Sequence, residues 1–191
     1  MEEIKYPTKE EIQKEYKRVK GIKLVRSTLV KVAGVIAVVS AMAVLVATLW
    51  MPVLQIYGSS MSPTLKEKNY VVTTKKSTYN TGDIIAFYYN NKILVKRVIA
   101  VPGDWFDMDY SGKVFVNGEP IDEPYLTESS FEPCDIRLPY QVQEDTLFVL
   151  GDNRSVSIDS RSSAVGAVAY DSIVGKLTFC VWPIKEMGAV K

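Results

Sequence analysis

A run of about twenty apolar or small residues, Val32 to Met51, constrains this chain more than any other feature. No charged residue occurs between Val32 and Leu65. Twenty helical residues span about 30 Å, which is the hydrocarbon thickness of a bilayer. The apolar region of a cleaved secretory signal is shorter, about 7–15 residues, and has no charged leader of 31 residues before it. The run therefore predicts an uncleaved transmembrane helix over residues 32–51.

The charges are distributed unevenly around this run. Residues 1–31 contain nine Lys or Arg and five Glu, whereas residues 32–191 contain 14 Lys or Arg and 17 Asp or Glu. By the positive-inside rule, we expect the basic leader 1–31 to be cytoplasmic and residues 52–191 to lie outside the cytoplasmic membrane, in a single-pass topology. A nucleic-acid-binding protein would carry a basic patch on its folded part, so the sequence argues against that class.

The leader allows two interpretations. Thr8 is followed three residues later by Glu11, which is typical of a helix capping box. One interpretation is a short amphipathic helix on the cytoplasmic side, lying at the lipid surface. The other is a solvated, partly disordered leader.

Beyond Pro52 the pattern changes to short β-type runs separated by Gly, Pro, Asn and Asp. Many short strands with turn signals predict a mainly β domain, an antiparallel barrel or sandwich, after the single transmembrane helix. Residues 105–145 include a polar, proline-bearing stretch that we expect to form an irregular lobe of the same domain. The predicted strands are 53–57, 70–74, 84–89, 92–100, 105–110, 113–116, 146–150 and 173–181.

The chain contains no histidine, which excludes Ser-His-Asp and Cys-His catalytic arrangements. A serine paired with a lysine remains possible, because a lysine kept neutral by burial can act as a general base. Ser60 lies about ten residues after the predicted span, so it is tethered within roughly 36 Å of the membrane exit. Lys96 lies within a predicted strand, where a solvated surface lysine is the ordinary alternative.

Six segments between Ser60 and Pro183 resemble, in order, the signature regions of the bacterial type I signal peptidases. The third of the main signatures, GDNR-x-x-S-x-D-S-R, is specific by itself. The segments are 60–65 (SMSPTL), 82–87 (GDIIAF), 96–104 (KRVIAVPGD), 116–120 (VNGEP), 151–161 (GDNRSVSIDSR) and 173–183 (IVGKLTFCVWP).

The resemblance implies roles for particular residues. Ser60 corresponds to the nucleophile and Lys96 to the general base of a Ser/Lys dyad. Ser157 corresponds to the residue whose hydroxyl orients the lysine amine. Asp159 and Arg161 correspond to a structural charge pair beneath the site, which Arg97 is a candidate to join.

The resemblance also implies what is recognised. Ile56 and Val95 correspond to residues that line shallow pockets for small side chains at the first and third positions before the cut. Some members of the family carry a serine at the position of Gly58, and the hydroxyl of that serine helps to bind the oxyanion. Gly58 lacks this hydroxyl, so the backbone N–H of Ser60 would remain as a donor. Implied partners are the signal peptides of exported preproteins and the lipid bilayer, with no metal, no organic cofactor and no obligatory protein partner.

Two other functions are compatible with parts of the sequence. A self-cleaving repressor-type protease shares Ser/Lys chemistry but has a DNA-binding domain where this chain has an apolar run. A non-catalytic, membrane-anchored β-domain would need neither Ser60 nor Lys96. Cys134 and Cys180 could pair outside the membrane, but 46 residues separate them, and we expect two free thiols, one in a loop and one in a strand.

Overall fold

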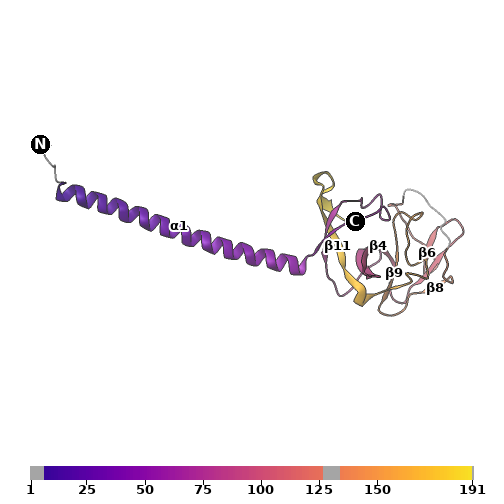
Figure 1. Cartoon of the computed structure of the whole chain (residues 1–191). Helices are drawn as coiled ribbons and strands as arrows, with labels where there is room; N and C mark the ends of the chain where they lie inside the picture. The colour runs from indigo at the N-terminus through magenta and orange to yellow at the C-terminus, as the bar shows by residue number, and fades with distance from the viewer. Residues whose placement is uncertain (1–6, 127–133, 191) are drawn as a thin grey trace. The chain divides into compact units, whose positions relative to one another are not determined.

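The structure is a computed structural model that describes residues 7–126 and 134–190, without the side chains of 46–50. The chain divides into two compact units, residues 1–47 and 48–191. Helix α1 (Lys9–Trp50), a single helix of 42 residues, makes up nearly all of the described part of the first unit, and its last three residues fall in the second unit (Figure 1). Within it, residues 9–45 contain a stretch that is long and apolar enough to cross a membrane.

Helix α1 begins with the capping box that the leader predicts. The backbone N–H of Thr8 donates to the Glu11 carboxylate at 2.8 Å, and the N–H of Glu11 lies 3.4 Å from the Thr8 hydroxyl. The structure differs from both interpretations of the leader, because the helix continues without a break into the apolar run. Its apolar side chains, from Ile12 to Leu45, are exposed on all sides, as a segment surrounded by lipid requires.

The second unit is mainly antiparallel β, as the sequence predicts. Four predicted strands have the predicted bounds, and the other four differ by one to two residues at one end. Four strands of two residues, β7, β8, β10 and β12, were not predicted. The strands are β1 (Val53–Gln55), β2 (Tyr70–Thr74), β3 (Ile84–Tyr89), β4 (Lys92–Ala100), β5 (Trp105–Met108), β6 (Val114–Val116), β7 (Glu119–Pro120), β8 (Tyr140–Gln141), β9 (Thr146–Leu150), β10 (Val168–Ala169), β11 (Ile173–Trp182) and β12 (Gly188–Ala189).

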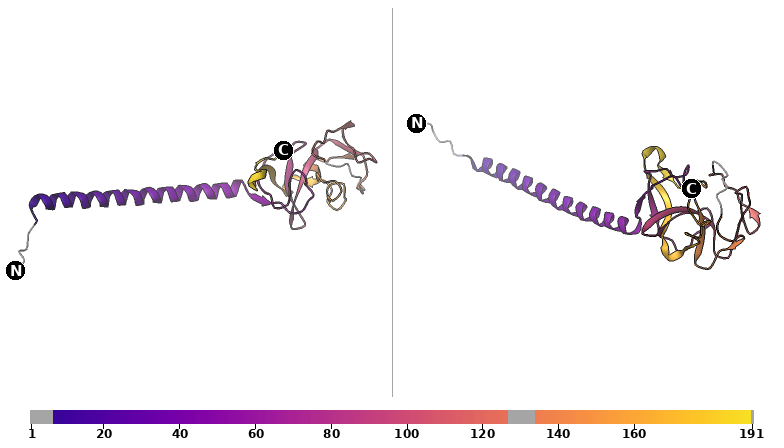
Figure 2. Two further views of the ribbon diagram at one scale, coloured as in Figure 1. Left: turned by 90° about the horizontal axis from the view of Figure 1, so that it is seen from above. Right: turned by 45° about the vertical axis from the view of Figure 1, so that its right-hand side comes forward.

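These strands form two sheets. The larger has eight strands in the order β1-β2-β11-β3-β4-β9-β10, with β12 paired to β11, and the smaller has the order β7-β6-β5-β8. The short 3₁₀ helices η1 (Tyr170–Ser172) and η2 (Ile184–Glu186) flank β11. Every strand pair is antiparallel. Strand β4 lies inside the larger sheet, between β3 and β9. Figure 2 shows the second unit in two further views, with the long strand β11 in yellow.

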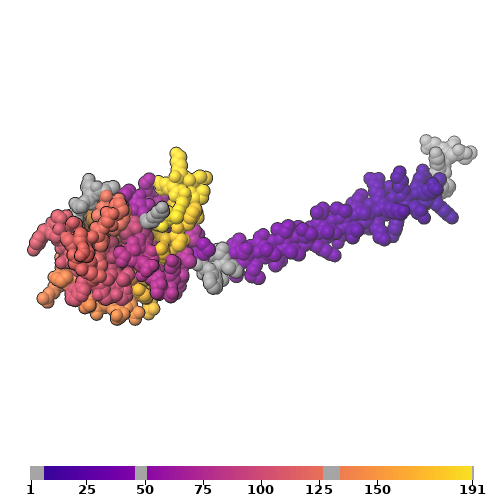
Figure 3. Space-filling view, turned by 180° about the vertical axis from the view of Figure 1, so that it is seen from behind, coloured from indigo at the N-terminus to yellow at the C-terminus, as the bar shows by residue number. Residues whose placement is uncertain are grey.

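The smaller sheet belongs to the lobe expected over residues 105–145. Its Phe106 ring stacks on Phe148 of β9 with a centroid separation of 4.1 Å. Ile99 and Leu150 of the larger sheet and Val114 of the lobe are buried in the same cluster. The lobe (pink to orange) and the C-terminal residues (yellow) lie at opposite ends of the face shown in Figure 3. An apolar core therefore fixes the lobe to the larger sheet.

Both cysteines are free, as expected. Cys180 is buried in β11 and Cys134 is half-buried in a loop. The Cys134 thiol lies 3.6 Å from the carbonyl oxygen of Arg161.

Candidate active site

Ser60 and Lys96 lie in hydrogen-bonding contact although 36 residues separate them. Lys96 Nζ donates to Ser60 Oγ at 2.9 Å. Lys96 projects from the central strand β4 and is only 2% exposed. Ser60 lies in a turn that is fixed by the buried side chains of Met61 and Leu65 and by the Leu65 N–H, which donates to the Met61 carbonyl at 2.8 Å. The sheet thus presents the amine to a serine hydroxyl on a rigid turn.

The surroundings of Lys96 favour its neutral form. Burial lowers the pKa of the Lys96 ammonium to about 8, and the positive charge of Arg161 acts in the same direction. The carboxylates of Asp159 and Asp152 oppose this shift. Burial dominates because an ammonium loses its hydration when it is enclosed. A minor part of the amine is therefore neutral near pH 7, and the neutral form predominates above about pH 8.

Ser157 belongs to the loop that follows β9. Its hydroxyl is buried and has no hydrogen-bond partner among the described residues, so the hydrogen bond to the Lys96 amine that the resemblance implies is not formed in this structure. Gly151 lies directly against it: a Cβ at position 151 would collide with the Ser157 hydroxyl and lie 2.7 Å from the carbonyl oxygen of Ser60. The absence of a side chain at Gly151 therefore lets the loop approach the nucleophile turn. The GDNR string is part of one signature segment, but nothing in the sequence indicates this close approach.

Asp159 and Arg161 form the buried charge pair that the resemblance implies. Arg161 Nε lies 2.8 Å from Asp159 Oδ1. The pair also holds the loop, because Asp159 Oδ2 accepts from the Gly151 N–H at 3.0 Å and Arg161 Nη2 donates to the Ser157 carbonyl at 3.3 Å. The pair thus fixes the backbone on both sides of the turn that carries Ser157.

Arg97 forms a second buried ion pair, with Asp152. Its Nε and Nη2 donate to the two carboxylate oxygens at 2.8 and 2.7 Å, and both side chains are at most 4% exposed. Thr64 donates its hydroxyl to Asp152 at 2.6 Å, and the Asn153 N–H donates to the Ser60 carbonyl at 3.0 Å. The loop after β9 is therefore hydrogen-bonded to the nucleophile turn at two positions, Thr64 and Ser60. Sequence reasoning missed Asp152 and Thr64, since a carboxylate and a threonine in turn motifs carry no sign of a buried partner.

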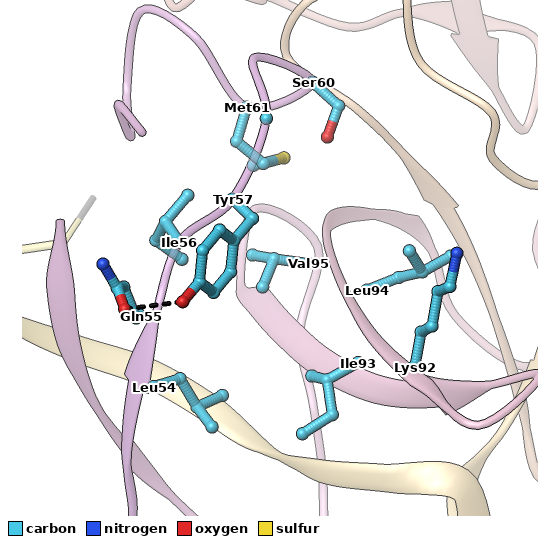
Figure 4. Close-up of a pocket in the computed structure, with 11 residues that line it drawn as sticks. Leu54, Gln55, Ile56, Tyr57, Ser60, Met61, Lys92, Ile93, Leu94 and Val95 are labelled. Atoms are coloured by element: carbon cyan, nitrogen blue, oxygen red, sulfur yellow. Dashed lines mark hydrogen bonds between the residues drawn. The ribbon is translucent and has the colours of Figure 1, made fainter. Parts of the chain in front are cut away.

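A groove of about 420 Å³ opens beside Ser60. It is lined by residues 54–58 and 92–95, together with Ser60 and Met61. Figure 4 shows the side chains of Ile56, Tyr57 and Val95 around this space and Ser60 at its edge. Ile56 is buried and Val95 is half-buried, and both also pack against the core cluster beneath the groove.

Gly58 lines the same groove with a φ of +80°. No atom would lie within 4 Å of an added Cβ there, so space is available. The positive φ nevertheless disfavours any residue with a side chain. The local backbone therefore explains glycine at this position, where a hydroxyl donor would otherwise be an advantage.

In residues 7–126 and 134–190, no three His, Cys, Asp or Glu side chains come together in a way that could hold a metal ion. The carboxylates of Asp152 and Asp159 are instead engaged in the two buried ion pairs, with Arg97 and Arg161.

Comparison with known proteins identifies the family. Residues 28–182 match the family model described as signal peptidase, peptidase S26. A signal peptidase I of Bacillus caldolyticus is 41% identical over 147 residues, which cover 68% of this chain and 78% of that protein. A signal peptidase I of Bacillus amyloliquefaciens is 31% identical over 177 residues, 87% of this chain and 95% of that protein. A crystal structure of a signal peptidase I from Enterococcus faecalis V583 aligns with 55% of this chain and all of that chain, at 30% identity and a TM-score of 0.47. This chain therefore belongs to the signal peptidase family S26, a family of serine peptidases.

Proposed function

We propose that this protein removes signal peptides from exported preproteins as a membrane-bound endopeptidase, with Ser60 as nucleophile and Lys96 as general base. The observation that carries the proposal is the 2.9 Å contact between Lys96 Nζ and Ser60 Oγ, combined with the burial of Lys96. A nucleophile and its base must lie within hydrogen-bond reach, and the pKa of the base must lie near the working pH.

The chemistry follows from this contact. When Lys96 is neutral, its lone pair accepts the proton of the Ser60 hydroxyl as Oγ attacks the scissile carbonyl carbon. The tetrahedral intermediate collapses to an ester on Ser60, and the Lys96 ammonium gives its proton to the leaving amine. Lys96 then takes a proton from a water molecule, whose oxygen attacks the ester carbon. As the bond to Ser60 Oγ breaks, Lys96 returns this proton to Oγ, and the signal peptide leaves with a free carboxylate. The Ser60 backbone N–H is the expected oxyanion donor, since Gly58 has no side chain to assist.

The groove supports a preference for small side chains before the cut. Its walls at Ile56 and Val95 are apolar and packed against the core, which leaves these two side chains little freedom to move aside for a bulky residue. Apolar walls reject charged side chains strongly but distinguish one methylene by only about 1–3 kcal/mol. We therefore assign Ile56 and Val95 to the binding of the first and third residues before the cleaved bond.

The apolar stretch of α1 supports a membrane anchor. The basic leader places the N-terminus in the cytoplasm and the catalytic unit outside, where signal peptides emerge. Enzyme and substrate then share the same membrane surface, which reduces the search for the scissile bond to nearly two dimensions.

The proposal is tested by cleavage of a fluorogenic peptide that carries a signal-peptide cleavage site. The full chain in detergent should cleave it at one bond, and Ser60→Ala should abolish cleavage. Ser59→Ala and Ser62→Ala are matched controls from the same turn and should retain measurable activity. An inactive wild type would favour a non-catalytic anchored domain, and an active Ser60→Ala would remove Ser60 from the mechanism.

A further inference from the structure

Residues 123–125, in the lobe, reach across to the buried charges that surround the Ser60–Lys96 pair. We propose that Glu123 and Tyr125 are positioning residues for catalysis, which clamp Arg97 and the loop after β9 in the geometry that the reaction needs. This inference rests on the proposed roles of Ser60 and Lys96, and no motif in the sequence pointed to either residue of the clamp.

Tyr125 covers the first of these charges. The Arg97 guanidinium carbon lies 3.9 Å from the centroid of the Tyr125 ring. A cation held against an aromatic face is stabilised most strongly when it is shielded from water, as Arg97 is at 3% exposed. Arg97 is the direct neighbour of Lys96 in β4 and the partner of Asp152. The ring therefore limits the positions that the Arg97–Asp152 pair can adopt.

Glu123 holds the second charge. It forms an ion pair with Arg154, and the two side chains are 8% and 2% exposed. Arg154 Nε in turn donates to the Gly151 carbonyl at 3.1 Å. Gly151 is the residue that lies against both Ser157 and the Ser60 carbonyl. A short chain of contacts thus connects the lobe to the backbone around the nucleophile.

The two clamp residues also fix one another. The Tyr125 hydroxyl donates to Glu123 Oε1 at 2.8 Å. Burial and, next, the Glu123 carboxylate raise the pKa of the Tyr125 hydroxyl, so it remains a protonated donor at every working pH. The Glu123 carboxylate therefore accepts hydrogen bonds from both Tyr125 and Arg154. A change at either Glu123 or Tyr125 should thus disturb the contacts of the other residue.

The clamp should affect the chemical step rather than substrate binding. The groove is lined by residues 54–58, 60, 61 and 92–95, and none of residues 123–125 lines it. Misplacing reacting groups by about 1 Å can lower a rate by about 10². Loss of the clamp should therefore lower kcat and leave KM nearly unchanged.

The first experiment compares three tyrosine variants of the full chain in detergent. Tyr125→Ala removes the ring from Arg97 and should lower kcat at least tenfold with KM within about twofold of wild type, a size consistent with a small displacement of the site. Tyr125→Phe keeps the ring over Arg97 and should recover most of that kcat. Tyr110→Ala is the control, because Tyr110 lies in the same lobe and is 94% exposed; it should match wild type.

The second experiment uses Glu123→Gln, which preserves shape but removes the charge that pairs with Arg154. It should lower kcat alone, and its effect combined with Tyr125→Ala should be smaller than the product of the two separate effects, because both residues act through one unit. Glu119→Gln, an exposed position of the lobe, is its control. Thermal unfolding of each variant identifies those that are folded at the assay temperature, and only those are scored.

Wild type and Ser60→Ala are measured in the same series. If wild type cleaves and Ser60→Ala does not, the proposed function holds, and the clamp is judged separately. Wild-type kcat in both folded Tyr125→Ala and folded Glu123→Gln would overturn the clamp, and so would a loss confined to KM. If Tyr125→Ala does not fold, the kcat of Glu123→Gln decides.

Discussion

At the scale of single residues, the burial that lowers the pKa of Lys96 makes its amine reactive but also lowers the free energy of unfolding of the protein. Its folded-state pKa of about 8 lies below the value of about 10.4 for a free lysine. Below pH 8 the amine is charged in both the folded and unfolded protein, and the folded protein bears the full cost of the buried charge. Between pH 8 and about 10.4 only the unfolded chain holds the proton, so stability rises with pH in this window.

Lys96→Met should therefore stabilise the protein while it abolishes cleavage. Methionine has a similar length and no charge, so below pH 8 the variant should gain up to about 3 kcal/mol in free energy of unfolding. The pKa of Lys96 lies about 2.4 below the free value, and each pKa unit corresponds to about 1.4 kcal/mol. The gain should disappear by about pH 10.4, where lysine is neutral in both states. Chemical denaturation at pH 7 and pH 10.5 checks this, and an equal gain at both values would contradict the role of the charge.

Gly151→Ala should inactivate the enzyme through a single methyl group. A Cβ there meets the Ser157 side chain and the Ser60 carbonyl oxygen, both of which belong to rigid turns. Overpacking of this kind costs about 1–3 kcal/mol of stability, and the displacement should reduce kcat by about 10² or more. Gly188→Ala is the control, since nothing lies within 4 Å of its added Cβ. Unchanged cleavage by Gly151→Ala would show that the loop moves freely.

At the scale of elements, strand β4 differs from a simple alternating strand. Strict alternation would place Lys96 on the face opposite Val95 and Arg97. In the structure the five residues from Lys96 to Ala100 are all buried. Val98, Ile99 and Ala100 lie in core clusters. Lys96 contacts Ser60 of the nucleophile turn, and Arg97 pairs with Asp152 of the loop after β9. Sequence patterning located this strand correctly, but burial on both faces depends on segments up to 65 residues away.

The other elements also divide into those that the local sequence pattern predicts and those that it does not predict. Longer strands such as β2, β3 and β9 were predicted with their exact bounds, because β-branched and aromatic runs between turn residues define them locally. The two-residue strands β7, β8, β10 and β12 were missed because two residues are too few to show an alternating pattern. Strands β8 and β10 pair with β5 and β9 across longer separations, whereas β7 and β12 pair with the neighbouring strands β6 and β11. Helix α1 was predicted in its apolar half, and the capping box at Thr8 indicated its start.

Asp152 is the link between β4 and the loop after β9, and its removal should be strongly destabilising. Asp152→Ala leaves the buried Arg97 guanidinium without this partner, and breaking a buried pair in this way costs about 3–5 kcal/mol. The double variant Arg97→Met/Asp152→Leu removes both charges and should recover much of that stability. Urea denaturation of wild type, the single variant and the double variant tests this. A double variant no more stable than Asp152→Ala would contradict it.

At the scale of the whole molecule, the sequence predicts which side of the membrane each unit occupies. A reporter enzyme that is active only outside the cytoplasm, fused after Lys191, should be active in cells. Reversing the charge bias, by changing the basic residues of 17–31 to Glu, should reduce that activity because these charges set the orientation. Cytoplasmic location of the reporter on the unaltered chain would contradict the predicted topology.

Much of the site could be predicted from the chain as a whole, because its six signature segments occur in the same order as in the signal peptidase family. Ser60 and Lys96 were located by the absence of histidine and by these segments. The partners that hold them, Asp152, Gly151 and Tyr125, could not be predicted, since their roles depend on side-chain distances that no local pattern encodes.

The most direct test of the Ser60–Lys96 mechanism is the pH dependence of kcat/KM for peptide cleavage, from pH 6 to 10. Because the general base must be neutral, kcat/KM of wild type should rise tenfold per pH unit at low pH and level off above about pH 8, the pKa of Lys96. Lys96→Arg keeps a positive charge but cannot release its proton in this range, so it should be folded and inactive. A wild-type profile that is flat across this range when chemistry limits the rate, or substantial cleavage by folded Lys96→Arg, would contradict the account.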